Sequence, residues 1–495
     1  MDSETLGYLS LIEARRLLDG RQISSVELTR AMLSRVAAVD QSLGSFLLVT
    51  EALAMERAQA ADRRIADGES ALLTGIPMAL KDIISTTGVA TTCGSRILEG
   101  YVPPYQGQVA QRLLDQGAVL IGKTNMDEFA MGSSTEHSGF FPARNPWDLE
   151  RVPGGSSGGS AAAVSAGLVT FALGTDTGGS IRQPAGLCGV VGVKPTYGRV
   201  SRYGLVAFAS SLDQIGPITR TVEDAAAVLS VIAGEDPADA TSLRAPVPDY
   251  LASLTADLHG IRVGVAREYF PDGLEAGVRA NVEAAISTLE SAGAKMVDIS
   301  LPMTEYALSS YYIVAPSEAM SNLARYDGVR FGHREHGDTI WEMFDRTRNA
   351  GFGREVKRRI LLGAYALSKG YYDAYYVKAQ QVRELVRQDF QRAFEQVDVI
   401  VGPTSPTTAF RLGERLSDPY AMYLADVFTL PANMAGICGV SVPCGLSEGL
   451  PVGLQILGNR LDEATMLKVA HAYQQSSENG TQRPPILQEH ATAAG

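Results

Sequence analysis

Residues 153–160 read Pro-Gly-Gly-Ser-Ser-Gly-Gly-Ser, and residues 174–180 read Gly-Thr-Asp-Thr-Gly-Gly-Ser. Lys81 lies far upstream, directly after an apolar run. A serine hydroxyl becomes a good nucleophile when a neighbouring base takes its proton, and a buried neutral lysine can be that base. Glycines leave backbone N–H groups free to approach a developing oxyanion. One such stretch alone would be a simple loop, but two of them with a lysine favour a hydrolase that uses no histidine.

The sequence around these stretches alternates between strand-like and helix-like segments. Short apolar runs predict buried strands, and longer periodic segments predict helices. The predicted strands are residues 118–121, 169–173, 189–193, 261–265, 295–299, 397–401, 439–442 and 452–456. The predicted helices are residues 109–116, 157–166, 277–292, 304–323, 354–393 and 463–474. This alternation predicts an α/β fold with a large mixed β-sheet covered by helices on both faces.

The chain divides into three parts by the character of its sequence. Residues 8–67 show the apolar periodicity of three amphipathic helices. No repeat or low-complexity linker interrupts the α/β region that follows, and the last residues are polar. We therefore expect an N-terminal helical segment at 1–70 packed on a single domain at 71–476, with a polar C-terminal tail at 477–495.

The composition argues against several classes of protein. The 495 residues carry a formal net charge of −12, so the chain as a whole should repel nucleic acid, and its densest basic cluster, Lys357-Arg358-Arg359, is short. Four cysteines show no C-x-x-C pair, which predicts buried thiols in a reducing compartment and no metal site. No signal peptide or membrane-spanning run is seen. We expect a cytoplasmic protein.

Two stretches match motifs of other enzyme classes. Residues 117–124 satisfy the phosphate-loop pattern G-x-x-x-x-G-K-[ST], but the four intervening residues are apolar and are better interpreted as a strand. Residues 154–158 fit the G-x-S-x-G nucleophile elbow of α/β-hydrolases, but turn-forming residues precede them where the elbow needs a strand. Both matches are weaker explanations than the serine–lysine pattern.

The two serine stretches with Lys81 resemble the amidase signature family. Within it, further motifs resemble the glutaminase subunits of tRNA-dependent amidotransferases over about residues 8–475. These motifs are residues 127–132, 144–148, 355–360, 370–376, 401–406 and 431–433. Residues 137–141 and 437–438 differ from the usual pattern of these subunits. We expect these differences to affect the local shape of the pocket and not the chemistry.

The resemblance implies a mechanism and its residues. Ser180 would attack the side-chain amide of glutamine, Ser156 would relay its proton, and neutral Lys81 would be the base. The Gly155–Ser156 peptide would be cis. The oxyanion hole would consist of backbone N–H groups of Thr177, Gly178, Gly179 and Ser180, and glutamine would be bound by Tyr311, Arg359 and Asp426.

The resemblance also implies partners. The B and C subunits of the amidotransferase would complete a heterotrimer, and the B subunit would use ATP and Mg²⁺ to activate mischarged Glu-tRNA(Gln) for amidation by the released ammonia. This chain would bind no cofactor or metal itself, and its turnover alone would be weak. A stand-alone amidase, a phosphate-loop ATPase and a non-catalytic interaction subunit remain the alternatives.

Overall fold

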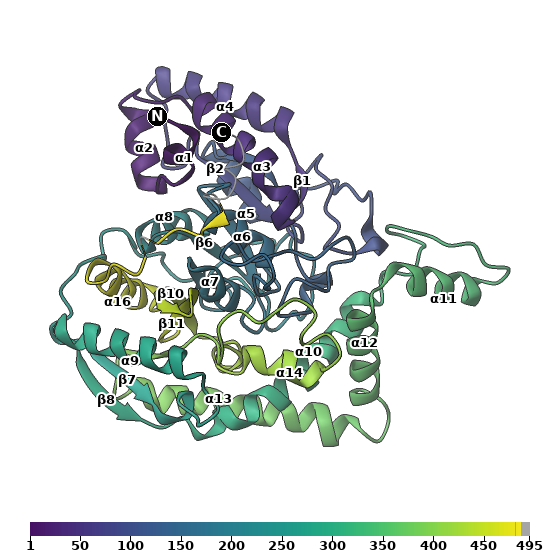
Figure 1. The fold of residues 1–495 in the computed structure, drawn as a ribbon. Coiled ribbons are helices and arrows are strands. Elements are labelled where there is room, and N and C mark those ends of the chain that lie inside the picture. The colour runs from purple at the N-terminus through teal and green to yellow at the C-terminus, as the bar shows by residue number, and fades with distance from the viewer. Residues whose placement is uncertain (481, 487–495) are drawn as a thin grey trace.

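One mixed sheet of eleven strands runs through the molecule (Figure 1). The computed structural model describes residues 1–480 and 482–486. The strand order is β1-β3-β2-β4-β6-β5-β10-β11-β9-β7-β8. The strands are β1 (Phe46–Val49), β2 (Pro77–Lys81), β3 (Val119–Thr124), β4 (Phe171–Asp176), β5 (Val191–Lys194), β6 (Gln214–Thr219), β7 (Arg262–Ala266), β8 (Lys295–Ile299), β9 (Val399–Pro403), β10 (Cys438–Ser447) and β11 (Leu450–Gly458). Parallel pairs such as β2–β3 and antiparallel pairs such as β10–β11 confirm the predicted mixed sheet.

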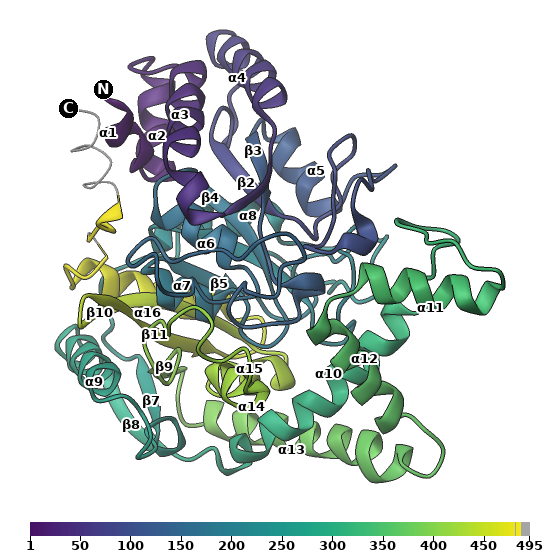
Figure 2. The same cartoon turned by 45° about the vertical axis from the view of Figure 1, so that its right-hand side comes forward.

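Helices lie on both faces of the sheet, as Figure 2 shows from a second side. A side chain on Gly186 of α7 would contact Ser441, whereas one on Gly458 would contact Cys438 and Met466 of α16. Ser441 and Cys438 point to opposite faces of β10, because side chains alternate along a strand. The helices are α1 (Ser3–Gly7), α2 (Leu11–Asp19), α3 (Ser25–Leu43), α4 (Glu51–Ala66), α5 (Gln108–Asp115), α6 (Gly158–Ser165), α7 (Arg182–Cys188), α8 (Val222–Ile232), α9 (Ala276–Ser291), α10 (Ala307–Leu323), α11 (Ile340–Gly351), α12 (Arg354–Ala366), α13 (Lys378–Phe394), α14 (Pro419–Tyr423), α15 (Leu430–Ala435) and α16 (Glu463–Gln475).

The structure corrects several predicted elements. Residues 8–67 contain a strand as well as helices, because β1 pairs antiparallel with β3 at the sheet edge. The single helical region predicted at 354–393 is two helices, α12 and α13, and Gly370 in the turn between them has a φ of +92°. Neither β6 nor α8 was predicted. The tail predicted at 477–495 lies partly outside the described residues, since 481 and 487–495 are not among them.

The phosphate-loop pattern at residues 117–124 is a buried strand, as its apolar residues indicated. Lys123 lies inside β3, where its Nζ donates to the Ile84 carbonyl at 2.8 Å and to Thr91 Oγ1 at 2.7 Å. The side chain is fully buried and lies 3.5 Å from Asp82. It is therefore part of the core and does not face a nucleotide.

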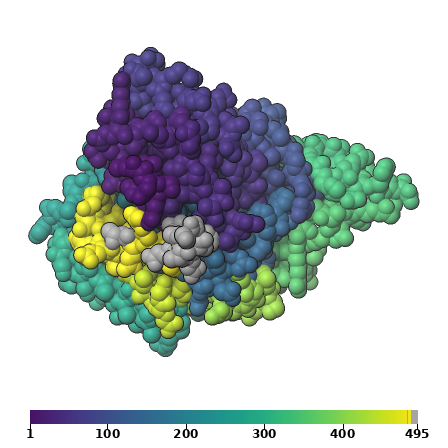
Figure 3. All heavy atoms as spheres, turned by 45° about the horizontal axis from the view of Figure 1, so that its top comes forward, coloured from purple at the N-terminus to yellow at the C-terminus, as the bar shows by residue number. Residues whose placement is uncertain are grey.

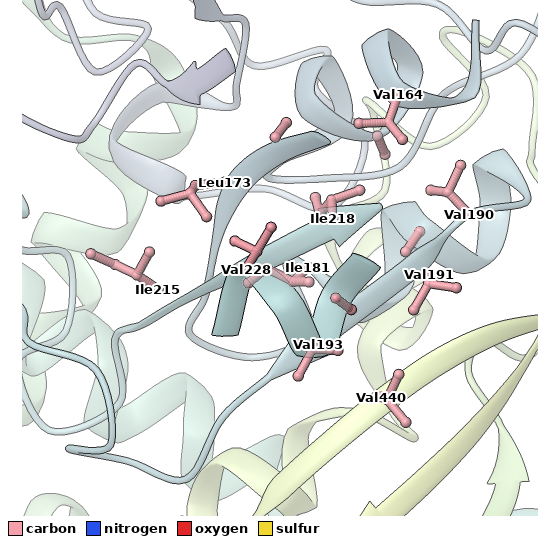
Figure 4. Close-up of a cluster of buried hydrophobic side chains, with 14 of the residues drawn as sticks. Val164, Leu173, Ile181, Val190, Val191, Val193, Ile215, Ile218, Val228 and Val440 are labelled. Atoms are coloured by element: carbon pink, nitrogen blue, oxygen red, sulfur yellow. The ribbon is translucent and has the colours of Figure 1, made fainter. Parts of the chain in front are cut away.

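A continuous apolar core supports the two serine stretches. Figure 4 shows side chains from several elements meeting around the middle of the sheet, among them Leu173 of β4, Ile218 of β6 and Val228 of α8. Residues 174–180 follow directly from Leu173, and α6 begins directly after Ser157. The loops that carry both serines thus begin at the buried apolar core.

This core can be tested at Ile218, which is completely buried. Ile218→Ala should lower the free energy of unfolding by about 2–5 kcal/mol, because it removes apolar contacts and leaves a cavity. Ile340→Ala, at a position that is 57% exposed, is the matched control and should change stability by less than about 0.5 kcal/mol. Chemical denaturation measures both. Equal effects would contradict the assignment of Ile218 to the core.

Candidate active site

Lys81 is the last residue of β2, which lies between β3 and β4 in the sheet. Its side chain is fully buried. The Nζ atom lies 2.7 Å from Ser156 Oγ, 2.9 Å from Ser157 Oγ and 2.8 Å from Thr175 Oγ1. The amine therefore has three hydroxyl partners and no carboxylate within ion-pair distance among the described residues.

Burial lowers the pKa of Lys81 from its usual value to about 7. The carboxylates of Asp127, Asp176 and Asp213 oppose this shift because they favour the charged ammonium. Desolvation is the larger effect, since taking an ammonium out of water is costly. A substantial fraction of Lys81 is therefore neutral near pH 7 and able to accept a proton from Ser156.

Ser156 is held in place by close backbone packing. The Gly155–Ser156 peptide bond is cis, as the resemblance implied. A side chain on Gly155 would place its Cβ 2.1 Å from Asp127 Oδ2, so only glycine fits there. The N–H of Ser157 donates to the Ser180 carbonyl at 3.2 Å. This bond brings the two serine stretches together.

Asp127 organises the loop beside Ser156, and our sequence interpretation gave it no role. Its backbone N–H donates to the Ser156 carbonyl at 3.3 Å. Its carboxylate accepts the N–H groups of Thr135 at 2.9 Å and His137 at 3.0 Å. Residues 127–132 were noted as a motif, but the partners of these bonds are set by tertiary structure. His137 thus keeps a defined backbone position although residues 137–141 depart from the usual pattern.

The loop that carries Ser180 is fixed by an ion pair behind it. Asp176 accepts the N–H of Gly179 at 2.9 Å and pairs with Arg182 at 3.0 Å. Burial would raise the pKa of Asp176, but the Arg182 guanidinium outweighs burial and lowers that pKa to about 2. Arg182 also donates to Asn433 Oδ1 of α15 at 2.6 Å. The buried network holds the loop rigid at neutral pH.

Backbone N–H groups of this loop are available to an oxyanion. Within residues 1–480 and 482–486, the N–H groups of Thr177, Gly178 and Ser180 donate to no protein acceptor. The N–H of Gly179 already donates to Asp176, so an oxyanion would have to share it. The side chain of Ser180 is 5% exposed, which places it at the accessible edge of a buried site.

Arg359 is buried, whereas Lys357 and Arg358 before it on α12 are half-buried. Its side chain is 3% exposed, and its Nε donates to Glu355 at 2.8 Å. The guanidinium lies 5.3 Å from the ring centroid of Tyr312 and 5.4 Å from that of Tyr423. These rings fix its orientation by cation–π attraction.

Asp426 lies against the Ser180 loop with an unsatisfied oxygen. A Cβ on Gly179 would lie 3.2 Å from Asp426 Oδ1, which is buried and has no hydrogen-bond partner in the described part of the chain. The other oxygen, Oδ2, accepts from Ser133. Burial raises the pKa of Asp426 to about 8. A buried carboxyl oxygen without a hydrogen-bond partner is costly, and a ligand group that donates to it would remove that cost.

Tyr311 completes the predicted set. A Cβ on Gly178 would lie 2.8 Å from the Tyr311 hydroxyl, so the tyrosine packs directly on the oxyanion loop. Residues from α10 and the segment 424–426 thus lie against the loop that ends at Ser180, and the charge of Arg359 acts on both Tyr311 and Asp426. Ser133 is an additional polar neighbour that the sequence interpretation missed, because it follows the motif at 127–132 and its contact with Asp426 is made only in the fold.

Two further kinds of site can be judged for the described residues. No group of three or more His, Cys, Asp or Glu side chains in this part of the chain is arranged to hold a metal ion. None of the helices there has the length and apolar character needed to cross a membrane.

Known proteins resemble this chain over nearly its whole length. The A subunit of glutamyl-tRNA(Gln) amidotransferase from Moorella thermoacetica is 60% identical over 482 residues, which is 97% of this chain and 99% of the relative. The same subunit from Roseiflexus castenholzii is 59% identical over 484 residues, with 98% and 99% covered.

Solved structures show the same fold. The crystal structure of the glutamyl-tRNA(Gln) amidotransferase A subunit from Thermotoga maritima has a TM-score of 0.78 at 44% identity, covering 98% of this chain and 97% of that one. The peptide amidase of Stenotrophomonas maltophilia has a TM-score of 0.81 at 32% identity, covering 97% and 98%. A family model described as Amidase matches residues 27–467. The resemblance that the serine stretches and Lys81 indicated is therefore confirmed, and this chain belongs to the amidase family.

Proposed function

We propose that this chain is the glutamine-hydrolysing subunit of a tRNA-dependent amidotransferase. The observation that carries the proposal is the buried Asp426 carboxyl beside the Ser180 loop, with the buried Arg359 guanidinium close enough for its charge to act on that carboxyl. Free glutamine carries an α-carboxylate and an α-ammonium, which a guanidinium and a carboxylate bind in a complementary way. A neutral amide would leave Asp426 Oδ1 without a donor and would add no carboxylate to the one that Arg359 already has in Glu355. A stand-alone amidase is therefore the weaker interpretation of this site.

We propose the following chemistry for these residues. Neutral Lys81 takes a proton from Ser156, and Ser156 takes one from Ser180 as Ser180 Oγ attacks the side-chain amide carbon of glutamine. N–H groups of Thr177, Gly178 and Ser180 stabilise the oxyanion. The proton then passes back to the nitrogen, the C–N bond breaks, and ammonia leaves a glutamyl ester on Ser180. Water hydrolyses this ester to glutamate by the same proton path.

The remaining steps belong to partner chains. In our proposal the B and C subunits complete a cytoplasmic heterotrimer. The B subunit holds the mischarged Glu-tRNA(Gln), ATP and Mg²⁺, and it amidates the activated glutamyl group with the ammonia released here. The net charge of −12 fits a chain that leaves tRNA binding to a partner. We retain 1–70, 71–476 and 477–495 as the proposed helical segment, amidase domain and tail.

Ser180→Ala should lower glutamine hydrolysis by at least about 10³-fold, because it removes the nucleophile. The same variant in the assembled enzyme should still amidate Glu-tRNA(Gln) when ammonia is added. Ser230→Ala, which removes a hydroxyl bonded only within its own helix at 2.9 Å, is the control. Normal glutamine turnover by Ser180→Ala would show that Ser180 is not the nucleophile.

The rate of glutamine hydrolysis should rise with pH through about 7. Lys81 acts in its neutral form, which becomes abundant only above its pKa of about 7. The rate should fall about tenfold per pH unit well below that value. Ammonia release measured from pH 5.5 to 8.5 tests this expectation. With a neutral aliphatic amide as the substrate, the rate should show the same rise with pH, because binding of that substrate does not need the charge of Asp426. A rate that fell as pH rose through 7 would mean that protonated Lys81 is the active form.

Arg359→Gln should raise KM for glutamine by about 10- to 100-fold, because a charge-assisted bond to the α-carboxylate is lost. It should change KM for a neutral aliphatic amide far less. The matched control is Arg358→Gln on the same helix, at a position whose side chain is 27% exposed. Circular dichroism checks that both variants fold. Equal effects of Arg359→Gln on the two substrates would count against its role in substrate binding.

A further inference from the structure

The outer surface of α12 and the turn after it is unusually apolar. Leu361 is 70% exposed and Tyr365 is 49% exposed. Further exposed side chains continue this surface along the turn toward α13. We call the whole set the tyrosine patch, and it consists of Leu361, Leu362, Tyr365, Tyr371, Tyr372 and Tyr375. The segment with α11 and α12 projects from the body of the molecule (Figures 1 and 3).

Three tyrosines of the patch form one cluster, and Leu361 and Leu362 lie one helical turn before Tyr365 on α12. The ring centroid of Tyr365 lies 4.6 Å from that of Tyr371 and 5.7 Å from that of Tyr375. The ring centroids of Tyr371 and Tyr375 lie 5.9 Å apart. Contiguous exposed apolar surface of this kind marks interaction sites, whereas isolated exposed side chains do not. Tyrosine is also enriched in protein–protein interfaces.

The charge around the patch is opposite to that of the chain. Residues 354–394 hold nine Lys and Arg against four Asp and Glu, in a chain with a net charge of −12. Lys369 and Lys378 flank the tyrosines, are exposed, and form no ion pair with any described residue, and Asp373 is the one acid between them. Two copies of this chain meeting through the patch would bring these like charges together. A self-complementary dimer is therefore disfavoured, and an acidic partner is favoured.

The apolar side chains decide which class of partner fits. Nucleic acid could pair with Lys369 and Lys378 but would leave Leu361 and Leu362 facing a charged backbone. A protein surface can cover the leucines and tyrosines and place carboxylates against the two lysines. We infer that the tyrosine patch docks another subunit of the amidotransferase, through a face that combines apolar side chains with Asp and Glu. The identity of that partner as the B or the C subunit rests on the function proposed above.

The position of the patch links it to the substrate site. The inner face of α12 buries Glu355, Val356 and Arg359, spaced so that they lie on one side of the helix. Gly363 continues this face, and a Cβ there would lie 2.1 Å from the Pro316 carbonyl of α10. The helix is thus packed closely on α10. A partner chain docked on the tyrosine patch would therefore contact the back of the helix that holds Arg359.

Binding of the purified B and C subunits to Leu361→Glu and Tyr365→Glu tests the inference. Each variant should weaken binding at least about tenfold, since a charge would be buried in an apolar interface. Val102→Glu and Tyr306→Glu, at positions each 49% exposed outside the patch, are the matched controls and should bind normally. Lys369→Glu with Lys378→Glu should slow association and reduce its dependence on salt. Isothermal titration and surface plasmon resonance measure these quantities.

Activity of the isolated chain separates this inference from the proposed function. Leu361→Glu should hydrolyse glutamine like the wild type when alone but lose stimulation by the partner chains. Ser180→Ala should bind those partners normally. Wild-type affinity in both patch variants would overturn the docking site while leaving the glutaminase proposal intact. The docking site would also be overturned if the patch variants lost binding only to tRNA or to anionic vesicles and kept their binding to the partner chains. If the wild type binds neither partner, both proposals are wrong.

Discussion

The candidate active site depends on the burial of one amine, that of Lys81. Lys81 lies inside the sheet with only hydroxyl groups within hydrogen-bond distance. Lys123, one strand away and equally buried, lies 3.5 Å from Asp82. Burial lowers the pKa of both lysines, but the Asp82 carboxylate favours the charged ammonium of Lys123 and opposes this shift. The hydroxyl groups around Lys81 carry no charge and offer no such opposition. Two lysines on neighbouring strands therefore differ in chemistry because of what surrounds them.

The glycines around the serines follow from the same compactness. An amine that must stay dry needs backbone packed tightly around it, and side chains on the adjoining loops would prevent this. A Cβ on Gly159 would lie 2.4 Å from the Asn125 carbonyl, and one on Gly155 would meet Asp127. The glycines in residues 153–160 are therefore there because neighbouring backbone and side chains approach too closely to leave room for a Cβ atom. This is why a local pattern of sequence could indicate chemistry before any fold was known.

Other residues of the site are not marked by any comparable local sequence pattern. Arg359 lies among ordinary helix charges in the sequence, and only the fold buries it between aromatic rings. Its role, like that of Asp426, was expected from family resemblance and not from residue spacing. Asp127 and Ser133 were missed because their partners come from tertiary contacts. Among fold elements, β1 and β6 escaped prediction: β1 is only four residues long, and β6 contains a glycine and a proline that resemble a loop.

In our proposals, helix α12 holds Arg359 on its buried face and presents part of the tyrosine patch on its exposed face. Its buried positions fix Arg359 against α10, and the spacing of a helix keeps them apart from Leu361 and Tyr365 on the other side. Close packing at Gly363 holds the helix against its neighbour, so its two faces cannot shift independently. Contacts made on the outer face would then reach the guanidinium through a single rigid helix. In our proposal, the stiffness of this one helix would couple glutamine binding to assembly of the complex, without a chain of rearranging side chains.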